Sequence, residues 1–194
     1  MKYLIAVCIL FLVVSMIVVS VSASEFRDGF IRLHILANSD IDLDQSNKLS
    51  LRDALIGEFG PDLSGFDSKD DAEVKICGMI SEIEEFCNKF LGNIGADYNA
   101  EVSLDREYYP NRIYENVSLP AGTYTSLKIT LGSGEGQNWW CVIFPSMCLN
   151  VAKDNSTYIA AGLSREDFEL ISNDRSPQYQ IKFKLFELFG KLFK

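Results

Sequence analysis

The chain has 194 residues, of which 47% are hydrophobic, with 18 Lys and Arg against 27 Asp and Glu. A chain of this length fits one domain, and its 13 Phe, 8 Tyr and 2 Trp exclude a disordered protein, in which aromatic residues are scarce. The formal net charge of −9 argues against a nucleic-acid partner, because neutralising phosphates requires a basic face.

The N-terminus predicts export. Lys2 precedes an apolar stretch from Leu4 to Val19, and the following "VSA" resembles a small-residue cleavage site. This stretch approaches the roughly 20 residues that span a bilayer. Residues 1–23 are therefore interpreted as a signal peptide or an uncleaved membrane anchor, and residues 24–194 as the exported domain. We expect an extracytoplasmic protein, with membrane contact through the N-terminal segment.

The segment "IRLHILANSD", residues 31–40, predicts a strand that enters a turn. Apolar side chains alternate with Arg32 and His34, which is typical of a strand with one buried face. A helix follows until Gly60 and Pro61, with Lys48, Leu51, Leu55 and Phe59 at helical spacing. Three carboxylates are able to cap its start: Asp40, Asp42 and Asp44.

A second helix is predicted from Ser68, which with Asp71 resembles a capping box, to Gly92. Its apolar stripe consists of Ala72, Ile76, Met79, Ile80, Ile83, Cys87 and Phe90. Cys77 and Cys87 would lie about 15 Å apart along the axis, too far for a disulfide. We interpret both cysteines as buried small hydrophobes.

The second half of the chain predicts strands. Tyr98 to Leu104 alternates apolar and polar residues, and an irregular connection follows with one short strand around Arg112 to Tyr114. Tyr124 to Leu131 and Asn138 to Phe144 flank "GSGEGQ", and this pattern predicts a β-hairpin. The glycines lack the Lys and the following helix of a phosphate-binding loop.

Beyond Pro145 we predict a short helix capped by Ser164. Residues 179–194 predict a final strand and a helix docked on the core, or alternatively a basic amphipathic membrane contact. The whole pattern predicts an α+β fold: a single domain with a mostly antiparallel sheet and helices packed on one face.

His34 is the only histidine of the sequence, and it precedes Asn38 and Asp40. A general base requires such neighbours, but residues of this kind regularly cap helices, so we favour a His34 that hydrogen-bonds into the sheet. The stretch "NSDIDLDQS" lacks the Gly and the Glu of a calcium loop. No Cys and His spacing predicts zinc. We therefore expect no metal and no cofactor.

Cys141 and Cys148 flank "VIFPSM". A strand followed by a turn brings such a pair within bridging distance in an oxidising compartment, so a disulfide and two free thiols both stay open. The enzymatic alternative is an exported envelope enzyme, a cysteine hydrolase with Cys141 as nucleophile and His34 as base. The position of the thiol inside a strand argues against it, because burial raises the pKa of a thiol and blocks substrate.

Four segments together resemble a known family: "IRLHILANSD", "DQSNKLSLRDAL", "LPAGTYTSLKITLGSGEGQNWWCVIFPSMC" and "IKFKLFELF". The sequence resembles the stage II sporulation protein R family over nearly the whole exported part. The resemblance implies a secreted signalling protein of endospore formation, made in the forespore and exported into the intermembrane space between forespore and mother cell. It also implies the partner and its action: activation of a membrane-embedded aspartic protease of the mother cell, which processes the precursor of sigma factor E.

The resemblance thus implies a ligand without catalytic residues. Matching segments suggest six partner-binding residues: His34, Asn38, Asp40, Gln45, Trp139 and Trp140. Consecutive strand residues face opposite sides of a sheet, so one of the two tryptophans is expected at an interface, and Trp140→Ala is expected to abolish signalling. Cys141 and Cys148 match cysteines of the family, which favours the disulfide.

Overall fold

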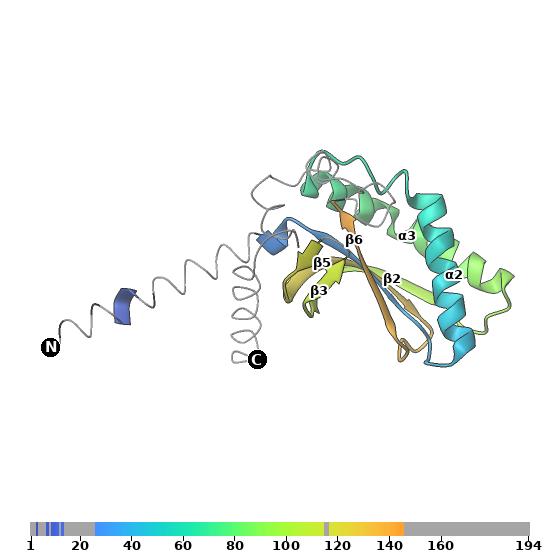
Figure 1. Cartoon of the computed structure of the whole chain (residues 1–194). Coiled ribbons are helices and arrows are strands. Elements are labelled where there is room, and N and C mark those ends of the chain that lie inside the picture. Colours follow the sequence, from blue (N-terminus) through green and yellow to red (C-terminus); the bar gives the residue numbers. More distant parts are fainter. Residues whose placement is uncertain are drawn as a thin grey trace.

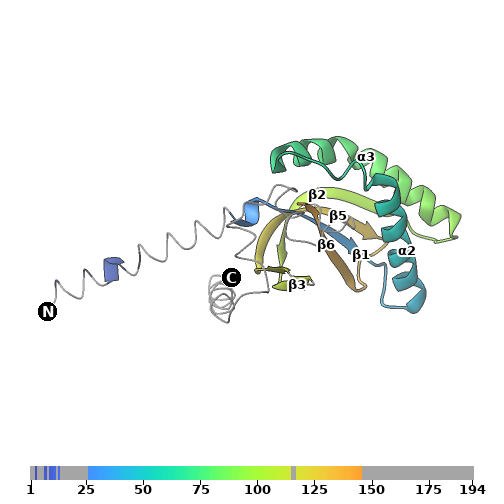
Figure 2. The same ribbon diagram turned by 45° about the horizontal axis from the view of Figure 1, so that its top comes forward.

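The computed structural model describes residues 26–114 and 117–145, together with a few positions between residues 3 and 13. In chain order the elements are β1 (Ile31–Leu36), α2 (Asp42–Phe59), α3 (Lys69–Asn93), β2 (Ala100–Tyr109), β3 (Arg112–Tyr114), β4 (Val117–Leu119), β5 (Gly122–Leu131) and β6 (Asn138–Phe144). Both helices cover the same face of the sheet (Figure 1, Figure 2). The predicted α+β fold is confirmed.

The main sheet has four strands in the order β2-β5-β1-β6, and β3 and β4 form a separate antiparallel pair. β5 is antiparallel to β2 and parallel to β1, while β6 is antiparallel to β1. The predicted hairpin between β5 and β6 is therefore wrong, because β1 lies between them. The connection at residues 132–137 is long enough to cross the end of β1 and reach its other side.

β1 is buried on both faces, which corrects the expectation of one buried face. Ile31, Leu33 and Ile35 join the core beneath the helices. On the opposite face Arg32 is 0% exposed and His34 is 8% exposed. The reason is the place of β1 inside the sheet, where side chains from the neighbouring strands cover the second face as well.

α2 buries the predicted stripe of Lys48, Leu51, Leu55 and Phe59. Its N-cap is Ile41, however, and no side chain caps the helix, so the predicted caps at Asp40, Asp42 and Asp44 are wrong. Asp44 is buried instead and turns inward. In α3 the predicted cap is confirmed, because Ser68 Oγ accepts a hydrogen bond from the backbone N–H of Asp71 at 3.1 Å.

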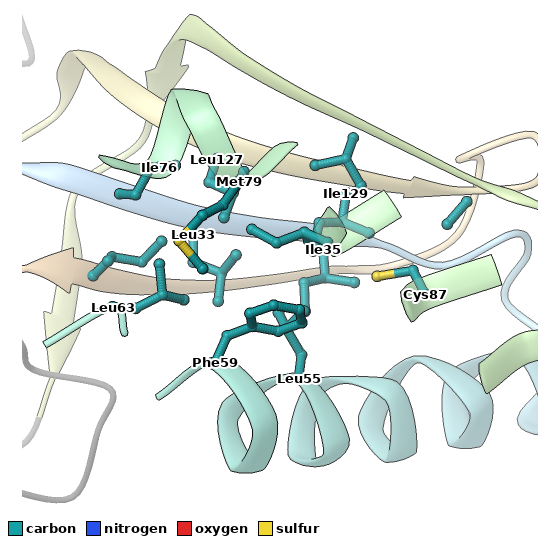
Figure 3. Packing of buried hydrophobic residues seen from close by; sticks show 14 of the residues in the cluster. Leu33, Ile35, Leu55, Phe59, Leu63, Ile76, Met79, Cys87, Leu127 and Ile129 are labelled. Atoms are coloured by element: carbon teal, nitrogen blue, oxygen red, sulfur yellow. The ribbon is translucent and has the colours of Figure 1, made fainter. Parts of the chain in front are cut away.

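The core fills the space between the helices and the sheet (Figure 3). Its labelled members come from β1, α2, α3, β5 and the segment between the helices: Leu33, Ile35, Leu55, Phe59, Leu63, Ile76, Met79, Cys87, Leu127 and Ile129. Burial, with the nearby charge of Glu84, raises the pKa of Cys87 to about 12, so this thiol stays protonated. Cys77 is exposed, contrary to our expectation, because it follows Ile76 and points away from the buried stripe.

β2 is longer than predicted, since it continues through Arg106 to Tyr109, and the short strand β4 was not predicted. The edge of β2 is covered by side chains of α3. Asn88 donates to the carbonyl of Ala100 at 3.1 Å and accepts from its N–H at 2.7 Å, and Glu84 accepts from the N–H of Val102 at 2.9 Å. These side chains occupy backbone groups that a further strand would otherwise pair with.

Several predictions fall outside the described residues: almost all of the export segment at residues 1–23, Cys148, the helix at Ser164 and the segment 179–194. Among the described residues, no helix combines the length and the apolar character needed to cross a bilayer.

Candidate partner-binding site

One group of polar and aromatic side chains lies on the far face of the sheet, opposite α2 and α3. We call it the far-face cluster, and its members are Arg32, His34, Glu107, Tyr109, Tyr124, Asn138 and Trp140. They come from all four strands of the main sheet. Because strand side chains alternate between faces, members that share a strand, such as Arg32 and His34 or Glu107 and Tyr109, lie two residues apart.

His34 joins the two edge strands of the sheet. Its Nδ1 lies 3.1 Å from Oε2 of Glu107 on β2, and its Nε2 lies 2.7 Å from Oδ1 of Asn138 on β6. Both ring nitrogens therefore face oxygen acceptors, and in the doubly protonated form both N–H groups donate. The expectation that His34 hydrogen-bonds within the sheet agrees with this geometry.

Glu107 is the ionic centre of the cluster. It also forms an ion pair with Lys128, whose Nζ lies 3.2 Å from Oε1 of Glu107. Burial alone raises the pKa of the Glu107 carboxyl. Hydrogen bonds from His34, Ser126 and Lys128, with the charge of His34, outweigh burial and lower this pKa to about 2.

Arg32 packs among aromatic rings on the same face. Its guanidinium carbon lies 4.3 Å from the ring centre of Tyr109 and 5.1 Å from that of Tyr124, and its Nε donates to the carbonyl of Cys141 at 3.1 Å. Arg112 stacks similarly over Trp140 at 3.8 Å. These cation–π contacts hold the rings in fixed positions.

A second polar group lies where β1 enters α2, and we call it the β1–α2 corner: residues 37–48 with the loop at residues 132–137. At its centre lies Asp44, which is 3% exposed. Its carboxylate accepts hydrogen bonds from the side chains of Asn38 at 2.8 Å, Ser39 at 2.6 Å and Tyr98 at 3.0 Å. Burial raises the pKa of Asp44, but these hydrogen bonds outweigh it, so the pKa is lowered and the carboxylate stays charged.

The loop at residues 132–137 is tied to this corner. The N–H of Ser133 donates to Asn38 Oδ1 at 2.9 Å, and the N–H of Gly136 donates to the carbonyl of Ala37 at 3.0 Å. A Cβ at Gly136 would lie 2.3 Å from the carbonyl oxygen of Ser39, so only glycine permits this approach.

Lys48 fixes the corner from the helix side. It is 4% exposed, and its Nζ donates to the carbonyl of Gln137 and to Oε1 of Gln45, both at 2.7 Å. Gln45 in turn donates to the carbonyl of Ser39 at 2.8 Å. Burial lowers the pKa of Lys48, and the charge of Asp40 partly opposes this effect.

The six residues expected to bind a partner do not form one surface. His34 and Trp140 lie in the far-face cluster, with ring centres 5.6 Å apart. Asn38 and Gln45 are part of the internal network of the corner, and Asp40 is exposed beside it. Trp139 lies on the helix side of the sheet, where the guanidinium carbon of Arg52 is 5.2 Å from its ring centre. Whether any of the six contacts a partner stays a prediction.

Sequence reasoning missed Glu107 and Tyr109 as site residues, because "REYYP" was assigned to an irregular connection. Their spacing of two residues was the available signal, because it places both on one face of a strand. In the structure they pair with Tyr124 and Gly122 of β5. Arg32 was assigned to the exposed face of its strand. Nothing in the sequence except a position at the end of a strand indicated that Asn138 belongs to the site.

The structure separates Cys141 from His34. Cys141 pairs with Leu33 and packs on the core side, whereas His34 pairs with Trp140 and faces the other way. Cys141 is also disulfide-bonded, so its sulfur is not a free nucleophile. Cys148 lies outside the described residues, and its pairing with Cys141 stays a prediction.

The fold and these two networks define the class of protein: a single α+β domain. Its polar side chains join the strands on one face of the sheet and hold the loops of the β1–α2 corner together by hydrogen bonds. The chain belongs to the stage II sporulation protein R family, since residues 27–154 match the family described as Stage II sporulation protein R. It is 36% identical over 160 residues to "Stage II sporulation protein R" of Bacillus subtilis (strain 168), across 76% of this chain and 71% of that protein. No solved structure matches the chain. The family supports a role in sporulation, and its name denotes no enzyme activity.

Proposed function

We propose that this chain is a secreted signalling protein of endospore formation. The forespore exports it into the intermembrane space, where it activates a membrane-embedded aspartic protease of the mother cell. That protease then removes the pro-segment of sigma factor E. In this proposal the chain is a ligand, and the peptide-bond chemistry belongs to its partner.

Membership of the stage II sporulation protein R family is the observation that carries the proposal. The geometry supports a ligand over the cysteine hydrolase, because Cys141 and His34 lie on opposite faces of the sheet. A general base has to lie within hydrogen-bond reach of its nucleophile, about 2.6 to 3.2 Å between heavy atoms.

Co-expression tests the proposal. The full chain, the protease and the sigma factor E precursor are produced in a bacterium that forms no spores, and shortening of the precursor is followed by gel mobility. We expect cleavage only when all three are present and when the chain keeps residues 1–23, which direct its export. A protease with its catalytic aspartate replaced is the matched control.

Cleavage of the precursor without the chain, or with a chain confined to the cytoplasm, would contradict the proposal. The His34→Gln variant with an intact disulfide addresses the enzymatic alternative. If it folds and still triggers cleavage, His34 is not a general base for the activity. Complete loss of cleavage with an unchanged fold and unchanged binding to the protease would favour an enzyme.

A further inference from the structure

The β1–α2 corner exposes two large apolar side chains close together. Ile41 is 59% exposed and Leu43 is 66% exposed, and they flank the exposed Asp42. Among the side chains described in residues 26–113 and 118–145, no other two large apolar residues more than half exposed lie within three positions of each other. Exposed apolar side chains that gather at one place, rimmed by polar residues, mark interaction sites.

The backbone that carries these side chains is held from inside. Asp44 and Lys48 are both nearly fully buried, and each makes hydrogen bonds to the loops of the corner. Buried charges cost free energy, and well-packed apolar residues would commonly stabilise such a place as well or better. What the network supplies is a single loop conformation, and a surface fixed before binding loses less entropy when its partner arrives.

The charge around the pair indicates the chemistry of the partner. Lys48 is the one Lys or Arg in the corner, residues 37–48 and 132–137, and it is buried, while Asp40, Asp42 and Glu135 are exposed. Glu135 belongs to the corner, because its N–H donates to the carbonyl of Asn38 at 3.2 Å. An acidic rim attracts a basic surface, and it repels both anionic lipid and the same corner of a second copy.

We propose that Ile41 and Leu43 insert into an apolar pocket, rimmed by Lys or Arg, on the extracytoplasmic surface of a protein partner. The inference rests on the proposed function, which makes that partner the membrane protease. Asn38 and Gln45 then act as positioning residues: they hold the corner in shape, and the apolar pair makes the contact.

The Ile41→Ser, Leu43→Ser double variant tests the contact in the full chain. Val74→Ser, Ile113→Ser is the matched control, because these two apolar residues are 74% and 68% exposed and lie on α3 and β3. Capture of the detergent-solubilised protease and cleavage of the precursor are measured together. We expect at least about a tenfold loss of both for the corner variant and less than about a twofold change for the control.

The results separate this inference from the proposed function. If the wild-type chain triggers no cleavage, the proposed function fails. If the wild type triggers cleavage and the corner variant does so equally well, the proposed function stands and the inference is overturned. It is also overturned if the double substitution abolishes flotation with protein-free anionic vesicles, or abolishes a dimer of the wild type, because the pair then contacts lipid or a second copy.

A second measurement does not depend on the folding of the double variant. A benzophenone residue is placed at position 43, and another at position 74 in a separate chain as the control. Under illumination we expect a covalent adduct with the protease from position 43 and none from position 74. An adduct from position 74 alone would overturn the inference.

Discussion

At the level of single residues, two carboxylates are each held by several hydrogen bonds or ion pairs. Glu107 lies between His34 and Lys128, and Asp44 collects three side-chain donors. In both carboxyls the hydrogen bonds outweigh burial and lower the pKa. Because their pKa values are lowered in the folded state, Glu107 and Asp44 both make the free energy of unfolding depend on pH.

The Glu107→Gln variant is expected to lose stability in a pH-dependent way. The pKa of Glu107 is about 2 in the folded state and about 4.5 in the unfolded state, so its contribution is fully present above pH 4.5 and disappears as the pH falls towards 2. After allowance for solvent screening, we expect the variant to be about 1 to 2 kcal/mol less stable at pH 6. Urea unfolding between pH 6 and pH 2 measures this, and a difference that stays constant would contradict it.

The buried Asp44 and the exposed Asp42 form a natural comparison within the first turn of α2. Asp44→Ala leaves its three half-buried donors without their acceptor and is expected to cost about 2 to 4 kcal/mol. Asp42→Ala removes only a favourable helix-dipole interaction, worth less than about 1 kcal/mol. Urea unfolding of both variants measures the contrast, and equal losses would show that the network at Asp44 contributes nothing of its own.

At the scale of elements, the helices and loops close the places where the sheet would otherwise be open. α3 covers the edge of β2 with Asn88 and Glu84, and the loop at residues 132–137 crosses the end of β1. Apolar periodicity and capping residues predicted α3, and the glycines predicted a turn at residues 132–137. Which strand edge α3 covers and which strand the loop crosses follow from the tertiary contacts.

Removing the cover of the β2 edge is expected to promote association. Asn88→Ala frees the backbone N–H and carbonyl of Ala100, which costs about 1 to 3 kcal/mol and exposes part of a strand edge. Asn93→Ala, at the exposed end of the same helix, is the control. Thermal unfolding with light scattering measures both effects; equal behaviour of the two variants would refute a protective role for Asn88.

Two glycines are expected to respond to alanine in opposite directions. Gly136→Ala places a Cβ 2.3 Å from the carbonyl oxygen of Ser39, so the loop has to move and the protein loses stability. Gly57 lies in α2 with no atom within 4 Å of the new Cβ, and Gly57→Ala is expected to stabilise by about 0.5 to 1 kcal/mol. Melting temperatures of both variants measure this, and a stabilising Gly136→Ala would contradict the close contact.

At the scale of the whole molecule, β1 comes first in the sheet and occupies an inner position. Residues 31–36 pair with residues 125–130 and residues 138–144, so the sheet requires contacts between the beginning and the end of the described domain. This arrangement separates β5 from β6 and brings His34 between Glu107 and Asn138.

Engineered cysteine pairs test this strand order. Leu36→Cys, Asn138→Cys joins direct partners on β1 and β6 and is expected to form a disulfide. Thr130→Cys, Asn138→Cys would bridge β5 and β6 in a hairpin, but with β1 between them the two positions lie about 9.6 Å apart, too far to bond. Peptide mapping by mass spectrometry identifies the bonds, and the reverse outcome would restore the hairpin.

Local patterns in the sequence were sufficient to predict both helices, the cap at Ser68, the buried stripe of α2, most strands and the family. The helices, cap and strands depend on neighbours a few residues apart, which periodicity and turn residues report directly, and the family follows from segments that resemble it. Three features became visible only in the folded domain: β1 lies between β5 and β6, Arg32 and His34 are buried, and Cys141 faces away from His34. The physical reason is that alternation assigns a side chain to a face of its strand, whereas strand order and the cover over each face arise from contacts between residues distant in the chain.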